Sequence, residues 1–193
     1  ANLPMKLESE RLVPKANNQN GFYWEHLLRY RFAKPYIVNK KVLDLGCGTG
    51  YGSAELISMG AKSVHGVDRA RDAIGFARAN YSLKSLSFKV ADALHLPFKN
   101  NTFDSVVSFE VIEHVKDYTK YLTEAFMVLK KGGYFIFSTP NIKQYRAGSS
   151  HFHFKEFSSQ ELHQIFKKMG LPLVLFGQTF KNHQFINAQK QYF

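Results

Sequence analysis

The chain has 193 residues, enough for one domain with a substantial core, and 45% of them are hydrophobic while 21% are charged. Its single cysteine, Cys47, excludes an intrachain disulfide and a cysteine-based zinc site and fits a reducing compartment. No apolar run approaches the roughly 18 residues that span a bilayer, and the N-terminus lacks the apolar core of a signal peptide. We therefore expect a soluble, cytoplasmic protein.

The formal net charge is +11, and it is unevenly distributed. Residues 130–193 carry nine Lys and Arg against two Glu. A basic region of this kind attracts phosphate groups, nucleic acid or an anionic surface. The basic residues are scattered rather than clustered, which favours a solvated surface. Nucleic acid therefore stays open as a partner but is not favoured.

Hydrophobic periodicity predicts strands and helices in almost strict alternation. Residues 1–20 are expected to be irregular, and a helix is expected from Phe22 to Tyr36. The alternation favours a mostly parallel sheet with helices on both faces, and ligands bind such sheets at the carboxyl ends of the strands. The other expected elements are strands at 42–45, 63–68, 86–90, 103–109 and 134–138, helices at 53–59, 72–81, 111–129 and 158–169, and an antiparallel pair at 173–176 and 185–188.

A glycine-rich loop, GCGTG at 46–50, joins the first expected strand to the next helix. Glycines there let the backbone turn sharply and let a ligand approach the main chain closely. The dinucleotide fingerprint has glycines at relative positions one, three and six, but Tyr51 stands at its third position here. An acidic residue, Asp44, lies in the strand just before the loop. A nicotinamide dinucleotide is therefore a minor alternative.

Five segments, in the same order and with the same spacing, resemble the motifs of class I S-adenosylmethionine-dependent methyltransferases. They are VLDLGCGTG at 42–50, HGVD at 65–68, VADALHLPF at 90–98, FDSVVSFEVIEHV at 103–115 and LKKGGYFIFSTPN at 129–141. The resemblance implies the Rossmann-like α/β fold of that family, with a mostly parallel seven-stranded sheet, helices on both faces and a C-terminal antiparallel strand. It also implies S-adenosylmethionine as the methyl donor.

The resemblance assigns donor-binding roles to individual positions. The glycine loop would accommodate the amino-acid part of the donor, Asp68 would accept from the ribose hydroxyls, and Asp92 would accept from the adenine amine. Taken singly, these two acids could equally cap a helix or hold a turn. Arg29 could bind the donor carboxylate, although solvent exposure fits it nearly as well. The expected donor-binding set is Arg29, Asp44, Gly46, Cys47, Gly48, Gly50, Asp68, Arg69, Asp92, Ala93 and Glu110.

Glu110, Glu113 and His114 occupy positions i, i+3 and i+4 of an expected helical turn and could therefore converge. In one interpretation His114 is a general base for the acceptor, which is our catalytic assignment. In a second, the three residues bind a divalent metal with His151 or His153, since E-x-x-E-H resembles metal-dependent small-RNA 2′-O-methyltransferases and also ubiquinone-type O-methyltransferases. In a third, the acids only favour a helix start and the histidine lines the pocket. We assign no metal ligand.

We expect a single methyltransferase domain over residues 1–193. Residues 1–36 would form an N-terminal helix or lid, 40–141 the donor-binding core, and 142–193 the acceptor-side segment with the last strands. The expected activity is methyl transfer to an O or N atom of a small-molecule acceptor. The alternatives are an RNA 2′-O-methyltransferase-like enzyme and a non-catalytic donor-binding protein. The sequence fixes neither the acceptor nor the oligomeric state.

Overall fold

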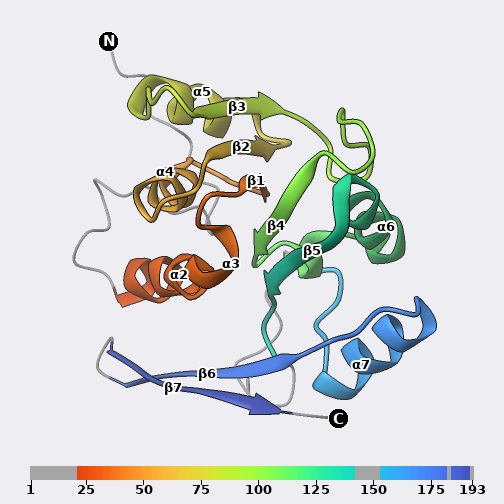
Figure 1. Cartoon of the computed structure of the whole chain (residues 1–193). Helices are drawn as coiled ribbons and strands as arrows, with labels where there is room; N and C mark the ends of the chain where they lie inside the picture. The colour runs from red at the N-terminus through yellow and green to blue at the C-terminus, as the bar shows by residue number, and fades with distance from the viewer. Residues whose placement is uncertain (1–20, 142–152, 182–183, 192–193) are drawn as a thin grey trace.

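The computed structural model describes residues 21–141, 153–181 and 184–191 (Figure 1). Helices and strands alternate along most of this length, as the periodicity predicts. The strands are β1 (Lys41–Leu45), β2 (Ser63–Asp68), β3 (Leu86–Val90), β4 (Phe103–Phe109), β5 (Leu129–Ser138), β6 (Leu175–Lys181) and β7 (Gln184–Gln191). The helices are α2 (Gly21–Phe32), α3 (Lys34–Ile37), α4 (Tyr51–Ser58), α5 (Arg71–Asn80), the 3₁₀ turn η1 (Ile112–His114), α6 (Tyr118–Val128) and α7 (Ser159–Lys168).

The first five strands form one parallel sheet in the order β3-β2-β1-β4-β5. The chain winds outward from β1 to β3 and then returns to place β4 on the other side of β1. In parallel sheets, ligands bind at the carboxyl ends of the strands where the winding direction reverses. The loops after β1 and β4 therefore flank the expected binding crevice.

The central strands β1 and β4 are buried at almost every position, which buries both faces of the middle of the sheet. Val42, Val64 and Val107 pack with side chains of α2 and α4 on one face. Leu43 and Val106, which are next to them in sequence and so point the opposite way, pack with α6 and α7. Figure 1 shows α2, α4 and α5 on one side of the sheet and α6 on the other. The prediction of a mostly parallel sheet with helices on both faces is confirmed.

The C-terminal strands differ from the expected single sheet of seven strands. In the described residues, β6 and β7 pair antiparallel with each other and form a separate two-stranded sheet. The two strands are paired with each other from Leu175 to Gln191, and in the described part of the chain neither of them pairs with the five-stranded sheet. The sheet that carries the expected binding crevice therefore has five strands.

Two local predictions at the end of β4 and in β5 are wrong. The helix expected over 111–129 is divided, because Val115 is extended after η1 and α6 begins only after its N-cap, Asp117. The strand expected to begin at residue 134 begins at Leu129, and residues 130–133 lie within β5 as an irregularity opposite β4, with Gly132 at φ 74°. The start of α7 follows the sequence closely, since Ser158 and Glu161 form a reciprocal capping box.

No helix in the described part of the chain is both long and apolar enough to cross a membrane.

Candidate functional site

The glycine loop after β1 is fastened to the end of β2. The backbone N–H groups of Gly46 and Cys47 donate to the carbonyl of Val67 at 2.8 and 3.0 Å. A Cβ atom at Gly46 would lie 2.4 Å from a Val111 methyl group, so this glycine allows a close approach to the β4 loop. The Cys47 side chain itself is buried. These contacts fix the path of the loop before any ligand binds.

Gly48 differs from the glycines on either side of it. Its φ is 52°, and a Cβ atom built on it would meet nothing within 4 Å. At Gly50, with φ 85°, the added atom would be 2.7 Å from both Ala77 and Phe88. The loop is therefore packed against the protein at Gly46 and Gly50 and faces open space at Gly48. A ligand can approach the backbone there, which fits the amino-acid part of the expected donor.

Asp68 ends β2 and holds two backbone groups. Its Oδ2 accepts from the Gly48 N–H and its Oδ1 from the Ala70 N–H, both at 2.9 Å. A carboxylate has about four acceptor positions, so both oxygens can still accept from ribose hydroxyls. Arg69, beside it, is exposed. The carbonyl of Asp68 also accepts from Ala91 N–H at 3.0 Å, which brings the loop after β3 alongside.

Asp92 and Ala93 occupy that neighbouring loop. The Asp92 side chain is 58% exposed, and its two oxygens contact the Leu94 N–H at 2.9 Å and His95 at 3.5 Å. Ala93 is half-buried against the main core. Asp92 therefore holds a turn and at the same time presents its carboxylate to solvent at the carboxyl end of β3. This exposure fits the expected contact with an adenine amine.

Asp44 is fully buried and engaged within the protein. Its carboxylate accepts from the Ser53 hydroxyl at 2.5 Å and from the Tyr30 hydroxyl at 3.2 Å. Burial raises the pKa of Asp44 to about 7, although these two hydrogen bonds act in the opposite direction. The structure thus gives Asp44 a clear role in joining α2 and α4 to β1, and its donor contact stays a prediction.

Glu110 and Arg29 lie together at the end of β4. Glu110 has φ 55°, and its backbone N–H donates to the Ser138 carbonyl at 3.2 Å. The Ser138 hydroxyl donates to Glu110 Oε1 at 2.5 Å, and Arg29 Nε lies 3.7 Å from the same oxygen. Arg29 is only 15% exposed, so the solvated alternative does not describe it. The pair joins α2 to the loop after β4, beside the glycine loop.

Glu113 and His114 come together with His153, not with Glu110. One ligand atom from each of these three side chains lies within 4.8 Å of the other two. The His114 and His153 rings meet edge to face, with centroids 4.9 Å apart. Glu110 turns toward Ser138 because its backbone is left-handed and not helical, which defeats the expected i, i+3, i+4 alignment. His151 lies outside the described residues.

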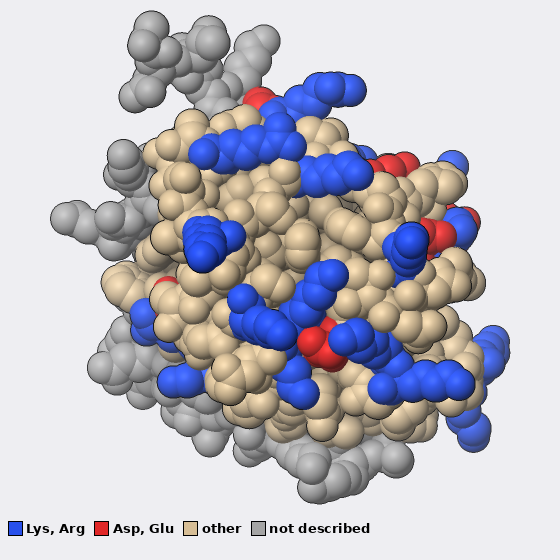
Figure 2. Space-filling view, turned by 45° about the horizontal axis from the view of Figure 1, so that its top comes forward, with Lys and Arg blue, Asp and Glu red and all other residues tan. Residues whose placement is uncertain are grey.

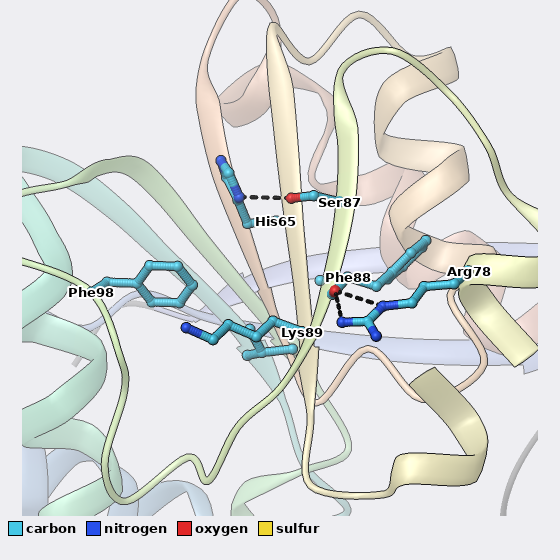
Figure 3. A pocket seen from close by; sticks show the side chains of 8 residues that line it. His65, Arg78, Ser87, Phe88, Lys89 and Phe98 are labelled. Atoms are coloured by element: carbon cyan, nitrogen blue, oxygen red, sulfur yellow. Dashed lines mark hydrogen bonds between the residues drawn. The ribbon is translucent and has the colours of Figure 1, made fainter. Parts of the chain in front are cut away.

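A hollow of about 370 Å³ lies elsewhere, along β2 and β3 (Figure 3). His65 and Ser87 are hydrogen-bonded at 2.8 Å on its wall, and Arg78 donates to the Phe88 carbonyl at 2.7 and 3.1 Å. Its lining comes from the middle of the two strands, not from their carboxyl ends. It contains none of the residues expected to bind the donor, so it is not the candidate site.

The geometry agrees with the comparison to known families. Residues 38–173, well over half of the chain, match the methyltransferase domain family. A Thermotoga maritima S-adenosylmethionine-dependent methyltransferase has the same fold, with a TM-score of 0.71, 21% identity and coverage of 93% of this chain and 90% of that one. The chain belongs to the family of S-adenosylmethionine-dependent methyltransferases, whose methyl donor is S-adenosylmethionine.

Two curated relatives illustrate the range of that family. A Mycolicibacterium smegmatis protein named a probable S-adenosylmethionine-dependent methyltransferase is 32% identical over 170 residues, covering 86% of this chain and 65% of the relative. A fatty-acid O-methyltransferase of the same organism is 34% identical over 107 residues, covering 55% of this chain and 39% of the relative. The chain therefore spans less than two thirds of the length of these relatives.

The residues that hold the site in place were not found from the sequence. Tyr30 and Ser53 hold Asp44, Ser138 holds Glu110, and Glu156 contacts His153 at 3.0 Å. Most of these pairs join segments that are far apart in the chain. Only Glu156, three residues after His153, could have been found from local spacing.

Proposed function

We propose that this chain transfers a methyl group from S-adenosylmethionine to an O or N atom of a small-molecule acceptor. The observation that carries the proposal is Gly48, which faces open space between two packed glycines and beside the carboxylate of Asp68. Family membership supports the donor. The O-methyltransferase relative supports an oxygen acceptor, although it matches only 55% of this chain.

The bound donor supplies a methyl carbon on a positively charged sulfur, which an oxygen or nitrogen lone pair can attack. The residues of the chain would bind this donor and orient it. Asp68 would accept hydrogen bonds from ribose hydroxyls, and Asp92 would accept from the adenine amine. Arg29, held beside Glu110, would face the donor carboxylate. Alignment of this kind is the main contribution that a protein makes to such a displacement.

The acceptor would lie beyond Glu110, next to the cluster of Glu113, His114 and His153. We propose His114 as the group that takes the acceptor proton, because it is half-buried at the end of η1 and histidine is the side chain that most often acts as a general base. The donor-binding core at 40–141, the helix or lid at 1–36 and the acceptor-side segment at 142–193 are proposed on the same basis.

The charge of the molecule motivates the RNA alternative. Figure 2 shows a face on which Lys and Arg side chains far exceed Asp and Glu, but they are spread across it rather than gathered into one stripe. A spread of this kind favours a solvated surface. RNA binding that weakens steeply with added salt, together with methyl transfer to RNA, would favour the alternative.

A radiolabelled-methyl assay tests the proposal directly. The chain is incubated with methyl-labelled S-adenosylmethionine and a panel of small hydroxyl, carboxyl and amine compounds, with an RNA oligonucleotide in parallel. We expect label in at least one small acceptor. Donor binding without transfer to any member of a broad panel would support the non-catalytic alternative, and transfer to RNA alone would overturn the small-molecule assignment.

A further inference from the structure

The carboxylate of Glu113 is buried in an unusual way. Its side chain is 0% exposed, and no described donor reaches either oxygen with ordinary hydrogen-bond geometry, although the Thr139 hydroxyl and the charge of Arg29 act on it from nearby. Taking a carboxylate out of water without a partner is strongly unfavourable. The Thr139 hydroxyl, at the end of β5, is another buried polar atom without a hydrogen bond in the described chain. A bound cation would remove the unfavourable burial of Glu113.

Two imidazoles lie where such a cation would need its other ligands. His114 and His153 each have a nitrogen within 4.8 Å of a Glu113 oxygen and of each other. In a tetrahedral site with metal–ligand bonds of about 2.0–2.2 Å, the ligand atoms of one ion lie about 3.3–3.6 Å apart. A pair separated by the full 4.8 Å would therefore have to close by a little over about 1 Å, on the order of a side-chain adjustment, when the ion binds.

The ligands are also held in place by their neighbours. The backbone N–H of Phe154 donates to the Glu113 carbonyl at 2.8 Å, which ties the segment before α7 to η1. Behind His153, Glu156 Oε1 lies 3.0 Å from Nδ1, and both side chains are nearly buried. A carboxylate on one ring nitrogen fixes the imidazole and leaves the other nitrogen for an ion, an arrangement common behind metal-bound histidines.

We infer that Glu113, His114 and His153 bind one divalent first-row transition-metal ion such as zinc. Two imidazoles with one carboxylate suit zinc or iron better than magnesium or calcium, which prefer oxygen ligands. Three protein ligands leave a coordination position for an oxygen atom of the acceptor or for water. That last role rests on the proposed function, and in the ion-bound chain His114 is a ligand, not a proton acceptor. Ion binding itself does not depend on methyl transfer.

Zinc titration tests the site. Tag-free chain is stripped with a chelator and titrated with Zn²⁺ by calorimetry, and we expect one ion per chain. Glu113→Gln and His153→Ala should each weaken binding by about a hundredfold or more, and Glu156→Gln by about tenfold. His163→Ala, which removes a histidine of α7 outside the cluster, is the matched control and should leave the affinity unchanged.

Cobalt absorption spectra, with Co²⁺ as the probe, report nitrogen and oxygen ligation independently.

The melting temperature of each variant without zinc separates loss of ligation from loss of fold. If Glu113→Gln unfolds, His153→Ala and Glu156→Gln provide the same comparison. The inference is overturned if the wild type binds no stoichiometric ion, or if Glu113→Gln and His153→Ala bind zinc as well as the wild type does. A chain that binds zinc but not S-adenosylhomocysteine contradicts the proposed function and leaves this inference intact.

Discussion

The donor side, at the carboxyl ends of β1 and β2, and the acceptor-side cluster of Glu113, His114 and His153 differ in how their carboxylates are hydrogen-bonded. Asp68 and Asp44 both accept hydrogen bonds from other residues of the chain at both carboxylate oxygens. Glu113, about as deeply buried as Asp44, accepts none from the described residues at either oxygen. The donor side is therefore organised by the chain's own hydrogen bonds. The acceptor side still needs something that the described chain does not supply.

The pKa values of the two buried carboxyls, Asp44 and Glu113, also differ in what determines them. Burial raises the pKa of both, but hydroxyl donors from Ser53 and Tyr30 limit the shift at Asp44 to a value of about 7. At Glu113 burial and the negative charge of Glu110 raise the pKa well above its ordinary value, although the Thr139 hydroxyl and the positive charge of Arg29 act in the opposite direction. A carboxyl of this kind is stabilised in its charged form only when a cation or a donor group comes to it.

The largest expected effect is on turnover, at the acceptor side. His114→Ala should lower the rate of methyl transfer by about a hundredfold or more, because it removes the proposed proton acceptor of the ion-free chain and a ligand of the inferred ion in the ion-bound chain. Affinity for S-adenosylhomocysteine should stay the same, since the donor loops do not include His114. Steady-state assays and calorimetry measure the two quantities, with His163→Ala as control. Unchanged turnover on the true acceptor would contradict the assignment.

The next effect is on stability, at the donor side. Gly50→Ala places a Cβ atom 2.7 Å from Ala77 and Phe88 at a residue with φ 85°, and should lower the free energy of unfolding by about 3 kcal/mol. Gly75→Ala, in α5 with nothing within 4 Å, is the matched control and should be neutral or slightly stabilising. Urea unfolding compares them. Equal stability of the two variants would show that the loop is not packed as described.

Donor affinity provides a third test. Asp68→Ala removes the acceptor for the Gly48 and Ala70 N–H groups along with the expected ribose contact, and should weaken S-adenosylhomocysteine binding by about thirtyfold. Asp72→Ala removes an exposed acid in the first turn of α5 and should change affinity less than twofold. If both variants bind equally well, Asp68 does not contact the donor.

A last prediction concerns how the free energy of unfolding depends on pH. The pKa of Asp44 is 3.8 in the unfolded chain and about 7 in the folded chain, so the folded state holds the proton up to a higher pH. Its contribution to stability is therefore complete below about pH 4 and is lost as the pH rises to about 7. Asp44→Asn should flatten this part of the curve of unfolding free energy against pH. An unchanged slope would mean that Asp44 is already ionised when folded.

The donor side was largely predictable from the sequence because its signals are local. The strands at 63–68, 86–90 and 103–109 coincide with β2, β3 and β4; Asp68 ends β2, and Asp92 and Glu110 follow β3 and β4. The glycine spacing, with Tyr51 at the third position of the dinucleotide fingerprint, already made a nicotinamide dinucleotide a minor alternative. Local periodicity is reliable where strands are apolar on both faces, since burial then leaves few alternatives.

The acceptor side was less predictable because it depends on contacts between distant segments. The positive φ of Glu110 and the extended Val115 break the helix that the sequence favours, so Glu110 does not join the cluster of Glu113, His114 and His153, although its charge still acts on Glu113. The link between Glu113 and Phe154 joins residues 41 positions apart, which no local pattern reports. The sequence named His153 only as an alternative to His151 in the metal interpretation, and its place beside His114 is a property of the fold.

Binding of S-adenosylhomocysteine to the wild type and to Gly48→Ala tests the central claim most directly. The added methyl group would project into the open space beside the loop and cost only about 1 kcal/mol of stability. The account predicts one molecule bound per wild-type chain and at least about tenfold weaker binding by Gly48→Ala, with a similar melting temperature. No binding by the wild type, or equal binding by Gly48→Ala, would contradict it.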